Sequence, residues 1–327
     1  MYTTFFNLRE KPFEITPDPR FLYLSENHKE ALAHLVYAVK ERRGFTVITG
    51  EVGTGKTTLV QTLLSKMDGT TRTAYLFNPK LGSTDFLQYI CEDFGLKGST
   101  RSKGQYLSQL HKFLLSCYTR GENVVLIVDE AQNLDPVLLE EVRLLTNLET
   151  TKNKLLQVIL IGQPELNDIL NETKCRQLKQ RVSLRYHIKP LSRDGTREYI
   201  RLRLRRAGAF DPNIFTPKAL DKIYGYAKGI PRSINIVCDN ALLSGYAADQ
   251  KVIGDQVIRE VIKNLEGPVT QKRRKGIKRI IVIGALVLLG GLLLAWGPGL
   301  LKSLEQGFLE AVQALKEVAV KISAMVR

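Results

Sequence analysis

Residues 50–58 have the sequence G-E-V-G-T-G-K-T-T and match the phosphate-binding pattern G-x-x-x-x-G-K-[ST]. Glycines in this pattern let backbone N–H groups point at phosphate oxygens, and the helix N-terminus that follows adds positive potential. Lys56 would neutralise charge on the β- and γ-phosphates, and the Thr57 hydroxyl would ligate Mg²⁺. The positions that we expect to bind the nucleotide are Gly50, Glu51, Val52, Gly53, Thr54, Gly55, Lys56, Thr57 and Thr58. The sequence therefore predicts a site for a nucleoside triphosphate with Mg²⁺.

A second acidic motif, Asp129-Glu130, follows the apolar run N-V-V-L-I-V at residues 123–128. A carboxylate at Asp129 can hold the Mg²⁺ that the phosphates bind, and its neighbour Glu130 can polarise water for attack on the γ-phosphorus. An acidic pair on the protein surface is the simpler alternative. The additional strand expected between the two motifs, together with a glutamate available as base, favours the catalytic-glutamate P-loop ATPases over kinases and GTPases.

Alternating strands and helices must position these motifs. Apolar runs predict strands at residues 45–49, 73–77, 123–128, 156–161 and 184–188, and helical patterns lie between them. From Pro190 onward the strands stop, and residues 194–207, 217–228, 231–247 and 255–265 all have helical patterns. The fold class is therefore α/β, with a parallel sheet core followed by an all-helical domain.

This pattern divides the chain into six parts. We expect an N-terminal approach segment (1–44), an ATPase core (45–190), a helical domain (191–266), a basic linker (267–279), one transmembrane helix (280–301) and a short amphipathic tail (302–327).

Composition adds limits to what the chain can bind. Its 327 residues carry a formal net charge of +15, which suggests an anionic partner such as nucleotide, nucleic acid or a membrane surface. The four cysteines are far apart and predict buried thiols in a reducing compartment. The histidines His28, His34, His111 and His187 form no cluster, so neither metal ligation nor histidine-based catalysis is indicated.

Residues 280–301 contain no charged side chain, and these 22 residues are enough to cross a hydrocarbon core of roughly 30 Å as a helix. Six Lys or Arg side chains precede this run closely and three follow it, which places the N-terminal bulk in the cytoplasm. A buried core helix is the alternative, and Gly290-Gly291 and Gly297-Pro298-Gly299 leave a re-entrant or membrane-surface arrangement open. We expect a single-pass protein of a bacterial inner membrane.

Several further stretches resemble the ExeA/GspA-type AAA+ ATPases of bacterial secretion and pilus-type loci, a family with a related branch in transposition. They are F-F-N-L-R-E-K-P-F (5–13), P-D-P-R-F-L-Y-L (17–24), the phosphate loop, V-D-E-A-Q (128–132), G-Q-P-E-L (162–166) and G-I-P-R (229–232). The resemblance covers about residues 1–265, in order. It implies a five-stranded parallel core, a helical lid formed by the all-helical domain, and ATPase activity in a homo-oligomer, either a ring or a dimer.

The resemblance also assigns roles to single residues. Gln163 falls at the sensor-1 position and would bond the γ-phosphate or the attacking water, and Arg232 falls at sensor 2 in the first turn of a lid helix. Arg181 is the candidate arginine finger for a neighbouring subunit, with Arg176 as the alternative. Tyr23 and Leu24 are candidates for the adenine pocket, although such residues can equally be core.

We therefore expect a membrane-anchored ATPase that couples ATP binding and hydrolysis to assembly or export by a bacterial envelope system. Family members often carry a large domain beyond the membrane, whereas residues 302–327 are too few for one, so direct cell-wall binding is doubtful. Their apolar stripe suggests pairing with a partner helix or contact with the outer leaflet. The rivals are a slow nucleotide-switched scaffold and a DNA-binding transposition-type ATPase. For the latter, a face with Arg197, Arg201, Arg205 and Arg206 would contact nucleic acid, but a solvated face is favoured.

Overall fold

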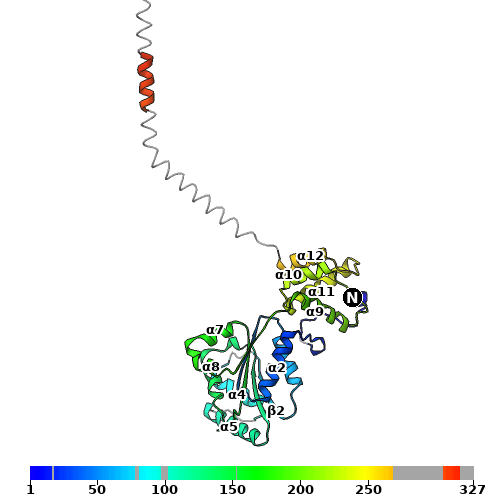
Figure 1. Ribbon diagram of the computed structural model, residues 1–327, viewed down its shortest axis with the longest axis vertical. Coiled ribbons are helices and arrows are strands. Elements are labelled where there is room, and N and C mark those ends of the chain that lie inside the picture. Colours follow the sequence, from blue (N-terminus) through cyan, green and yellow to red (C-terminus); the bar gives the residue numbers. More distant parts are fainter. Residues whose placement is uncertain (17, 78–80, 97–101, 152, 268–304, 317–327) are drawn as a thin grey trace, which may run out of the picture. The chain divides into compact units, whose positions relative to one another are not determined.

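The computed structural model describes residues 1–16, 18–77, 81–96, 102–151, 153–267 and 305–316 (Figure 1). These residues fall into two units, Met1–Leu265 and Glu266–Arg327. The first unit contains every predicted nucleotide-site residue and is described first.

Five strands in the described part of the chain form one parallel sheet. They are β1 (Phe45–Gly50), β2 (Thr71–Leu76), β3 (Asn123–Val128), β4 (Gln157–Gly162) and β5 (Leu184–Ile188), in the order β2-β3-β4-β1-β5. β1 lies between β4 and β5, and every residue of β1 and β4 is buried. The predicted parallel sheet is confirmed, with strand ends that differ by one or two residues from the sequence pattern.

Helices cover both faces of this sheet (Figure 1). On one face, α2 (Glu26–Lys40) and α3 (Lys56–Ser65) pack on Val125 and Ile127 of β3. On the other face, α4 (Ser83–Asp93), α5 (Lys103–Thr119) and α6 (Pro136–Leu145) pack on Val124, Leu126 and Val128. This alternation along a single strand is the period of two that a sheet buried on both sides requires. The short helices η2 (Ala131–Asn133), α7 (Glu165–Asn171), η3 (Thr173–Cys175) and α8 (Arg176–Arg181) complete the core.

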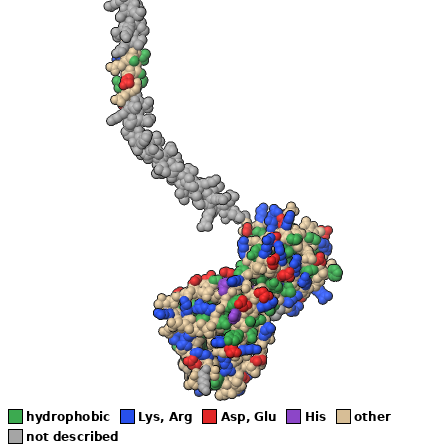
Figure 2. Space-filling model, viewed as in Figure 1, with side chains coloured by type: hydrophobic (Ala, Val, Ile, Leu, Met, Phe, Trp, Pro, Cys, Tyr) green, Lys and Arg blue, Asp and Glu red, His purple; other side chains and the backbone are tan. Residues whose placement is uncertain are grey.

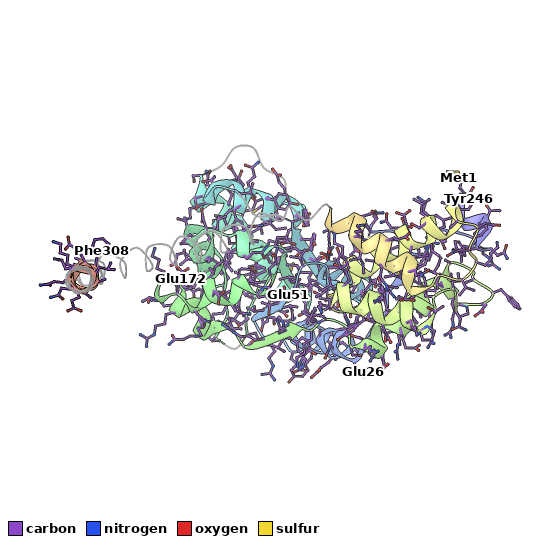
Figure 3. All side chains as sticks on the ribbon, turned by 90° about the horizontal axis from the view of Figure 1, so that it is seen from above. Met1, Glu26, Glu51, Glu172, Tyr246 and Phe308 are labelled. Carbon is purple, nitrogen blue, oxygen red and sulfur yellow. The ribbon has the colours of Figure 1, made fainter. Side chains whose placement is uncertain are left out.

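The lid is a separate helical layer with its own apolar core. It contains α9 (Arg193–Arg206), α10 (Pro217–Ala227), α11 (Pro231–Ala247) and α12 (Asp255–Glu266). The start of the chain also belongs to it, because Phe6 and Phe13 are buried in the same core as α9 and α11. The Tyr2 hydroxyl, in α1 (Tyr2–Phe5), donates a 2.5 Å hydrogen bond to Asp239 of α11. Met1 and Tyr246 accordingly lie close together at the lid end of the first unit (Figure 3).

This placement differs from the predicted division into a 1–44 segment and a 191–266 lid. Residues 1–13 pack in the lid, whereas α2 packs on the sheet. Residues 14–25, which include the short helix η1 (Pro19–Phe21), connect the two, and we call them the strap. Apolar spacing did not reveal this because the only helix in the described part of the strap is the three-residue η1, which is too short to produce a periodic pattern.

Among the residues that the structure describes, none of the helices combines the length and apolar character needed to cross a bilayer. The run 280–301 lies outside those residues, so the transmembrane helix stays a prediction. In the second unit, residues 305–316 form a helix whose residues are all exposed, including Phe308, Val312 and Leu315 of the predicted apolar stripe. In the first unit, Cys91, Cys117, Cys175 and Cys238 are all buried, and none of these four forms a disulfide.

Candidate nucleotide-binding site

The phosphate loop connects the buried strand β1 to α3. Gly53 and Gly55 adopt left-handed backbone angles, with φ of +81° and +96°, that favour glycine. A Cβ atom on Gly53 would lie 2.6 Å from Cβ of Arg232, so this glycine also permits close approach of the lid. Gly55 is the N-cap of α3, whose first N–H groups therefore open toward the loop.

Lys56 spans this loop. Its Nζ donates hydrogen bonds to the carbonyl oxygens of Gly50 (2.7 Å) and Glu51 (3.1 Å). Burial lowers the pKa of the ammonium group, and the nearby carboxylates of Glu130 and Asp129 oppose that shift. The loop thus holds a buried cation that has no ion-pair partner among the described residues, as expected of a phosphate-binding lysine.

Asp129 lies at the end of β3 and is fully buried. Its Oδ2 accepts hydrogen bonds from Thr57 Oγ1 (3.1 Å) and the Tyr75 hydroxyl (2.7 Å), and its Oδ1 accepts one from the Glu130 N–H (2.9 Å). The structure therefore brings together the two residues predicted to hold Mg²⁺. Their hydroxyl and carboxylate oxygens fit the preference of Mg²⁺ for hard oxygen ligands.

Glu130 follows in a left-handed conformation, with φ of +51°. Its Oε2 accepts hydrogen bonds from Gln132 Nε2 (2.5 Å) and from Gln163 Nε2 (3.2 Å). The predicted base and the predicted sensor-1 residue are thus direct neighbours, although 33 positions separate them in the chain. Gln132 was not predicted as a site residue.

A cavity of about 450 Å³ extends from the phosphate loop to the lid. Residues 52–58, Glu130 and Arg232 line one part of it, and Tyr23 lines another. His28 of α2 and further strap and lid residues complete the wall; the strap and lid residues are Glu14, Ile15, Thr16, Asp18, Phe21, Leu22, Leu191, Tyr199, Arg203, Pro231 and Asn235. Leu24 is not among the described residues that line this cavity; it packs against the core of α2 and α3. The adenine-pocket prediction therefore names one wall residue, Tyr23, and one core residue.

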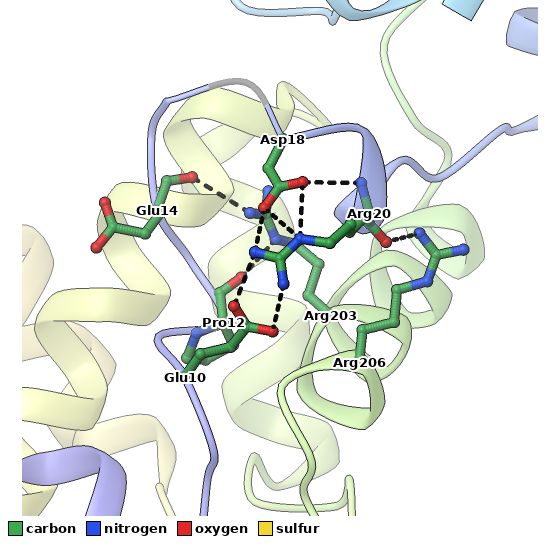
Figure 4. A network of polar contacts seen from close by, with 7 residues as sticks. All are labelled: Glu10, Pro12, Glu14, Asp18, Arg20, Arg203 and Arg206. Atoms are coloured by element: carbon green, nitrogen blue, oxygen red, sulfur yellow. Dashed lines mark hydrogen bonds and ion pairs between the residues drawn. The ribbon is translucent and has the colours of Figure 1, made fainter.

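The lid side of the cavity depends on Arg203, which sequence reasoning missed. This buried guanidinium donates to the carbonyl oxygens of Pro12 (2.5 Å) and Glu14 (3.2 Å) (Figure 4). It also donates to the Tyr199 hydroxyl (2.7 Å). It also lies over the Phe21 ring, 4.9 Å from the centroid. Arg203 therefore fixes residues 12–14, where the chain enters the strap, by charge-assisted hydrogen bonds.

Asn235 of α11 holds the strap from a second direction. Its Nδ2 donates to the Glu14 carbonyl (3.1 Å), and its Oδ1 accepts from the Tyr199 hydroxyl (2.8 Å). A signal for Arg203 existed in the sequence, because the positions 196, 199, 200, 203 and 204 are the buried face of α9. An arginine on that face requires buried acceptors, but the sequence did not indicate that the strap supplies them.

His28, on α2, also contacts the phosphate loop. Its Nε2 bonds the Thr54 carbonyl (2.9 Å) and its Nδ1 bonds Ser25 Oγ (2.6 Å). The carbonyl can only accept, so Nε2 carries the proton and Nδ1 accepts from the serine hydroxyl. Burial lowers the pKa of this imidazole. The role of His28 was not predicted, because an isolated histidine gives no cluster in the sequence even when it is buried and makes structural hydrogen bonds.

The structure places the predicted arginines in different surroundings. Arg232 is the second residue of α11. It lines the cavity and donates its backbone N–H to the Gly53 carbonyl (3.3 Å). Arg181 ends α8 and donates to Thr146 Oγ1 (3.3 Å), and Arg176 is exposed at the start of the same helix. Neither Arg181 nor Arg176 is among the described residues that line the cavity of their own chain.

Three of the four arginines on the predicted face of α9 have acidic or backbone partners, and the fourth, Arg205, is exposed. Arg197 pairs with Asp221 (2.7 Å) and Asp194 (3.1 Å), and Arg201 pairs with Glu198 (3.1 Å). Arg206 donates to the Leu22 carbonyl (3.0 Å) and to the Arg20 carbonyl. Acidic and basic side chains are correspondingly mixed over the lid surface in Figure 2. This mixture supports the solvated-face interpretation rather than a nucleic-acid surface.

Comparison with known proteins agrees with this geometry. Residues 39–170 match the family model described as AAA domain. In fold, the chain is similar to Drosophila ORC bound to DNA (TM-score 0.62, 18% identity, 81% of this chain and 66% of that one). It is also similar to Aeropyrum pernix ORC2 in ADPNP–ADP complexes (TM-score 0.58, 17% identity, 77% and 71%). The fold and the site together define a P-loop ATPase of the AAA class.

A curated relative gives a narrower assignment. The chain is 49% identical over 248 residues to General secretion pathway protein A of Aeromonas hydrophila, which is 76% of this chain and 45% of that protein. The chain thus spans less than half the length of this relative. The resemblance to the ExeA/GspA-type AAA+ ATPases, which the motifs in the sequence suggested, is confirmed over these residues.

Proposed function

We propose that this protein binds Mg²⁺-ATP between its core and its lid and hydrolyses it to drive assembly or export by a bacterial envelope system. The observation that carries the chemical part is the convergence of Lys56, Thr57, Asp129 and Glu130 at the carboxyl ends of β1 and β3. Each has the functional group that phosphoryl transfer to water needs.

The roles follow from position. Lys56 and the N–H groups at the start of α3 bind the β- and γ-phosphates. Mg²⁺ held by Thr57 and Asp129 would neutralise phosphate charge in the transition state. Glu130 accepts a proton from the attacking water, and Gln163, whose amide lies 3.2 Å from that carboxylate, orients the same water or the γ-phosphate. Arg232 donates its backbone N–H to the Gly53 carbonyl of the loop, which supports a role in coupling lid angle to nucleotide state.

The experiment is steady-state ATP hydrolysis by the full-length protein in detergent, with and without Mg²⁺. We expect turnover that chelation abolishes and that Thr57→Val reduces strongly, because valine keeps the shape and loses the hydroxyl. Thr70→Val, on an exposed turn, is the matched control. Turnover that is independent of Mg²⁺, or unaffected by Thr57→Val, would remove Thr57 and Asp129 as the metal site.

The cellular part of the proposal rests on two observations. The relative of 49% identity is a general secretion pathway protein, and residues 280–301 have the length and composition of a membrane span behind a basic run. We therefore place the ATPase on the cytoplasmic side of the inner membrane, with envelope-assembly proteins as partners. Carbonate extraction and a topology reporter fused after Arg327 test this placement. Release by carbonate, together with salt-sensitive binding of duplex DNA, would favour the transposition-type rival.

The proposed function also includes assembly of the protein into a homo-oligomer. Arg181 lies outside its own chain's cavity, which is the arrangement that an arginine finger acting on a neighbouring subunit requires. If Arg181 acts on a neighbouring subunit, the ATPase activity of a mixture of Arg181→Ala and Lys56→Ala subunits differs from the sum of the activities that the two variants have separately. Arg176→Ala is the comparison. Activity that Arg181→Ala leaves unchanged at every protein concentration would eliminate it as the finger.

A further inference from the structure

Gln132 uses both ends of its amide to connect two parts of the catalytic site. It lies in η2, directly after β3, and its Nε2 donates to Glu130 Oε2 at 2.5 Å. Its Oε1 accepts the backbone N–H of Gln163, at the end of β4, at 3.0 Å. With the 3.2 Å bond from Gln163 Nε2 to Glu130 Oε2, the three residues form a closed ring of hydrogen bonds.

The chemistry at this position requires an amide. The end that faces Glu130 must donate, because an ionised carboxylate only accepts, and the end that faces the Gln163 N–H must accept. These two partners also fix the orientation of the amide, since the opposite orientation would lose both bonds. Space is limited as well: a Cβ on Gly162 would lie 2.8 Å from Gln132 Oε1, so the glycine in G-Q-P-E-L leaves room for this contact.

We propose that Gln132 is a positioning residue for ATP hydrolysis, which holds the Glu130 carboxylate at a fixed place relative to Gln163. This inference rests on the proposed function of Glu130 as the base. A base must stay within hydrogen-bond reach of the water that it deprotonates, and a glutamate side chain on a left-handed residue has no helix or strand to restrain it.

Gln163 is less suited to supply this restraint during the reaction. Its side-chain amide is the group assigned to the γ-phosphate or the water, so its contact with Glu130 shifts when the amide turns to the substrate. Gln132 is anchored on the backbone N–H of Gln163, which does not depend on where the Gln163 side chain points. Gln132 therefore keeps hold of Glu130 while the Gln163 amide turns to the substrate.

The test compares Gln132→Met with Gln132→Glu in the full-length protein. Methionine keeps the length and removes both bonds, whereas glutamate keeps the acceptor for Gln163 and removes the donor to Glu130. We expect kcat to fall on the order of 10- to 100-fold in both, the range for loss of a hydrogen bond to a charged group, with KM and ATP affinity within twofold of wild type. Gln88→Met is the matched control, because Gln88 is an exposed glutamine of α4 that also donates to a glutamate, Glu92.

A double-mutant cycle separates positioning of the base from a general structural effect. In a Glu130→Gln background, adding Gln132→Met should not lower the residual single-turnover rate further. The inference is overturned if Gln132→Met leaves kcat within threefold of wild type, raises KM instead, or lowers the rate equally in both backgrounds. Failure of the proposed function looks different: Glu130→Gln itself would then retain wild-type turnover.

Discussion

The two halves of the nucleotide cavity are built in different ways. The phosphate half consists of the loop at residues 50–58 with Asp129 and Glu130, and each of these segments directly follows a buried parallel strand. The lid half consists of the strap, α9 and α11, which are joined by the side chains of Arg203, Tyr199 and Asn235. The first half is fixed by local geometry at strand ends, and the second by contacts between segments about 190 to 220 positions apart.

This difference suggests a division of labour. The phosphate half presents a buried cation, N–H groups and two carboxylates, which are the groups that bind and cleave phosphates. The lid half presents the strap backbone and aromatic rings such as Tyr23 and Tyr199, whose centroids are 5.9 Å apart. The lid half is therefore suited to contact the nucleobase of the nucleotide and to move together with the lid helices. The predictions below test that division in order of decreasing effect.

Lys56→Ala should have the largest effect. Lys56 is buried and is the only lysine in the loop. Its removal should weaken ATP binding on the order of 100-fold or more, because charge-assisted bonds to phosphate are lost. Calorimetric titration of the full-length protein measures this. Lys66→Ala, at the end of α3, should bind as wild type. If Lys56→Ala binds within threefold of wild type, the lid half dominates affinity and the proposed division is wrong.

Arg203→Met should have the next largest effect, and it should change two quantities. The carbonyl oxygens of Pro12 and Glu14 lose a charge-assisted donor, which should lower the free energy of unfolding by about 2–4 kcal/mol. ATP affinity should fall about tenfold because the strap is no longer fixed, a decrease smaller than that of Lys56→Ala. Thermal unfolding and titration, with the exposed Arg201→Met as control, check both. Unchanged affinity in a folded variant would show that the strap does not contact nucleotide.

Tyr75→Phe should have a smaller effect, confined to the metal. The Tyr75 hydroxyl is one of three donors that orient the Asp129 carboxylate, so its removal should raise the Mg²⁺ concentration for half-maximal activity by about three- to tenfold. Tyr89→Phe, whose hydroxyl contacts only a backbone carbonyl of β2 among its described bonds, is the control. An equal shift in both variants would assign the effect to the sheet edge rather than to Asp129.

His28 should have the smallest effect, visible only as a pH dependence. Burial lowers its pKa, so between that value and about 6.5 the unfolded chain binds more protons than the native state. The free energy of unfolding therefore rises with pH across this window, and acidification from pH 7 removes stability. His28→Gln should lose less stability than wild type between pH 7.5 and 5.5 in urea unfolding, with His34→Gln as control. The same pH dependence in wild type and His28→Gln would contradict the assignment.

The sequence predicted the phosphate half nearly completely. A strand, a glycine-rich loop and a helix are adjacent in the chain, so the positions of Lys56 and Thr57 follow from local spacing. Asp129 and Glu130 directly follow the continuous apolar run at residues 123–128, which already predicted a central strand. Gln163 and Arg232 came from the family resemblance; in the structure Arg232 lines the cavity, and Gln163 bonds Glu130, which lines it too.

The lid half could not be predicted to the same extent. The strap has no periodic pattern of apolar residues, so nothing in its sequence shows that residues 1–13 leave the core and pack in the lid. Tyr23 and Leu24 are adjacent in the chain yet face different surroundings, because an irregular segment turns each side chain independently. Gln132 was missed for a related reason, since its role requires the end of β4 to lie beside η2, which only the folded sheet determines.

The central claim is that this site hydrolyses ATP with Glu130 as the base, and Glu130→Gln tests it most directly. Glutamine keeps the shape and hydrogen-bonding capacity of the side chain and cannot accept the proton. ATP affinity and turnover of the same full-length variant should be measured side by side. We predict binding within threefold of wild type and a turnover rate that is lower by about 10²- to 10⁴-fold. Turnover within twofold of wild type, with binding intact, would contradict the account, because another group would then activate the water.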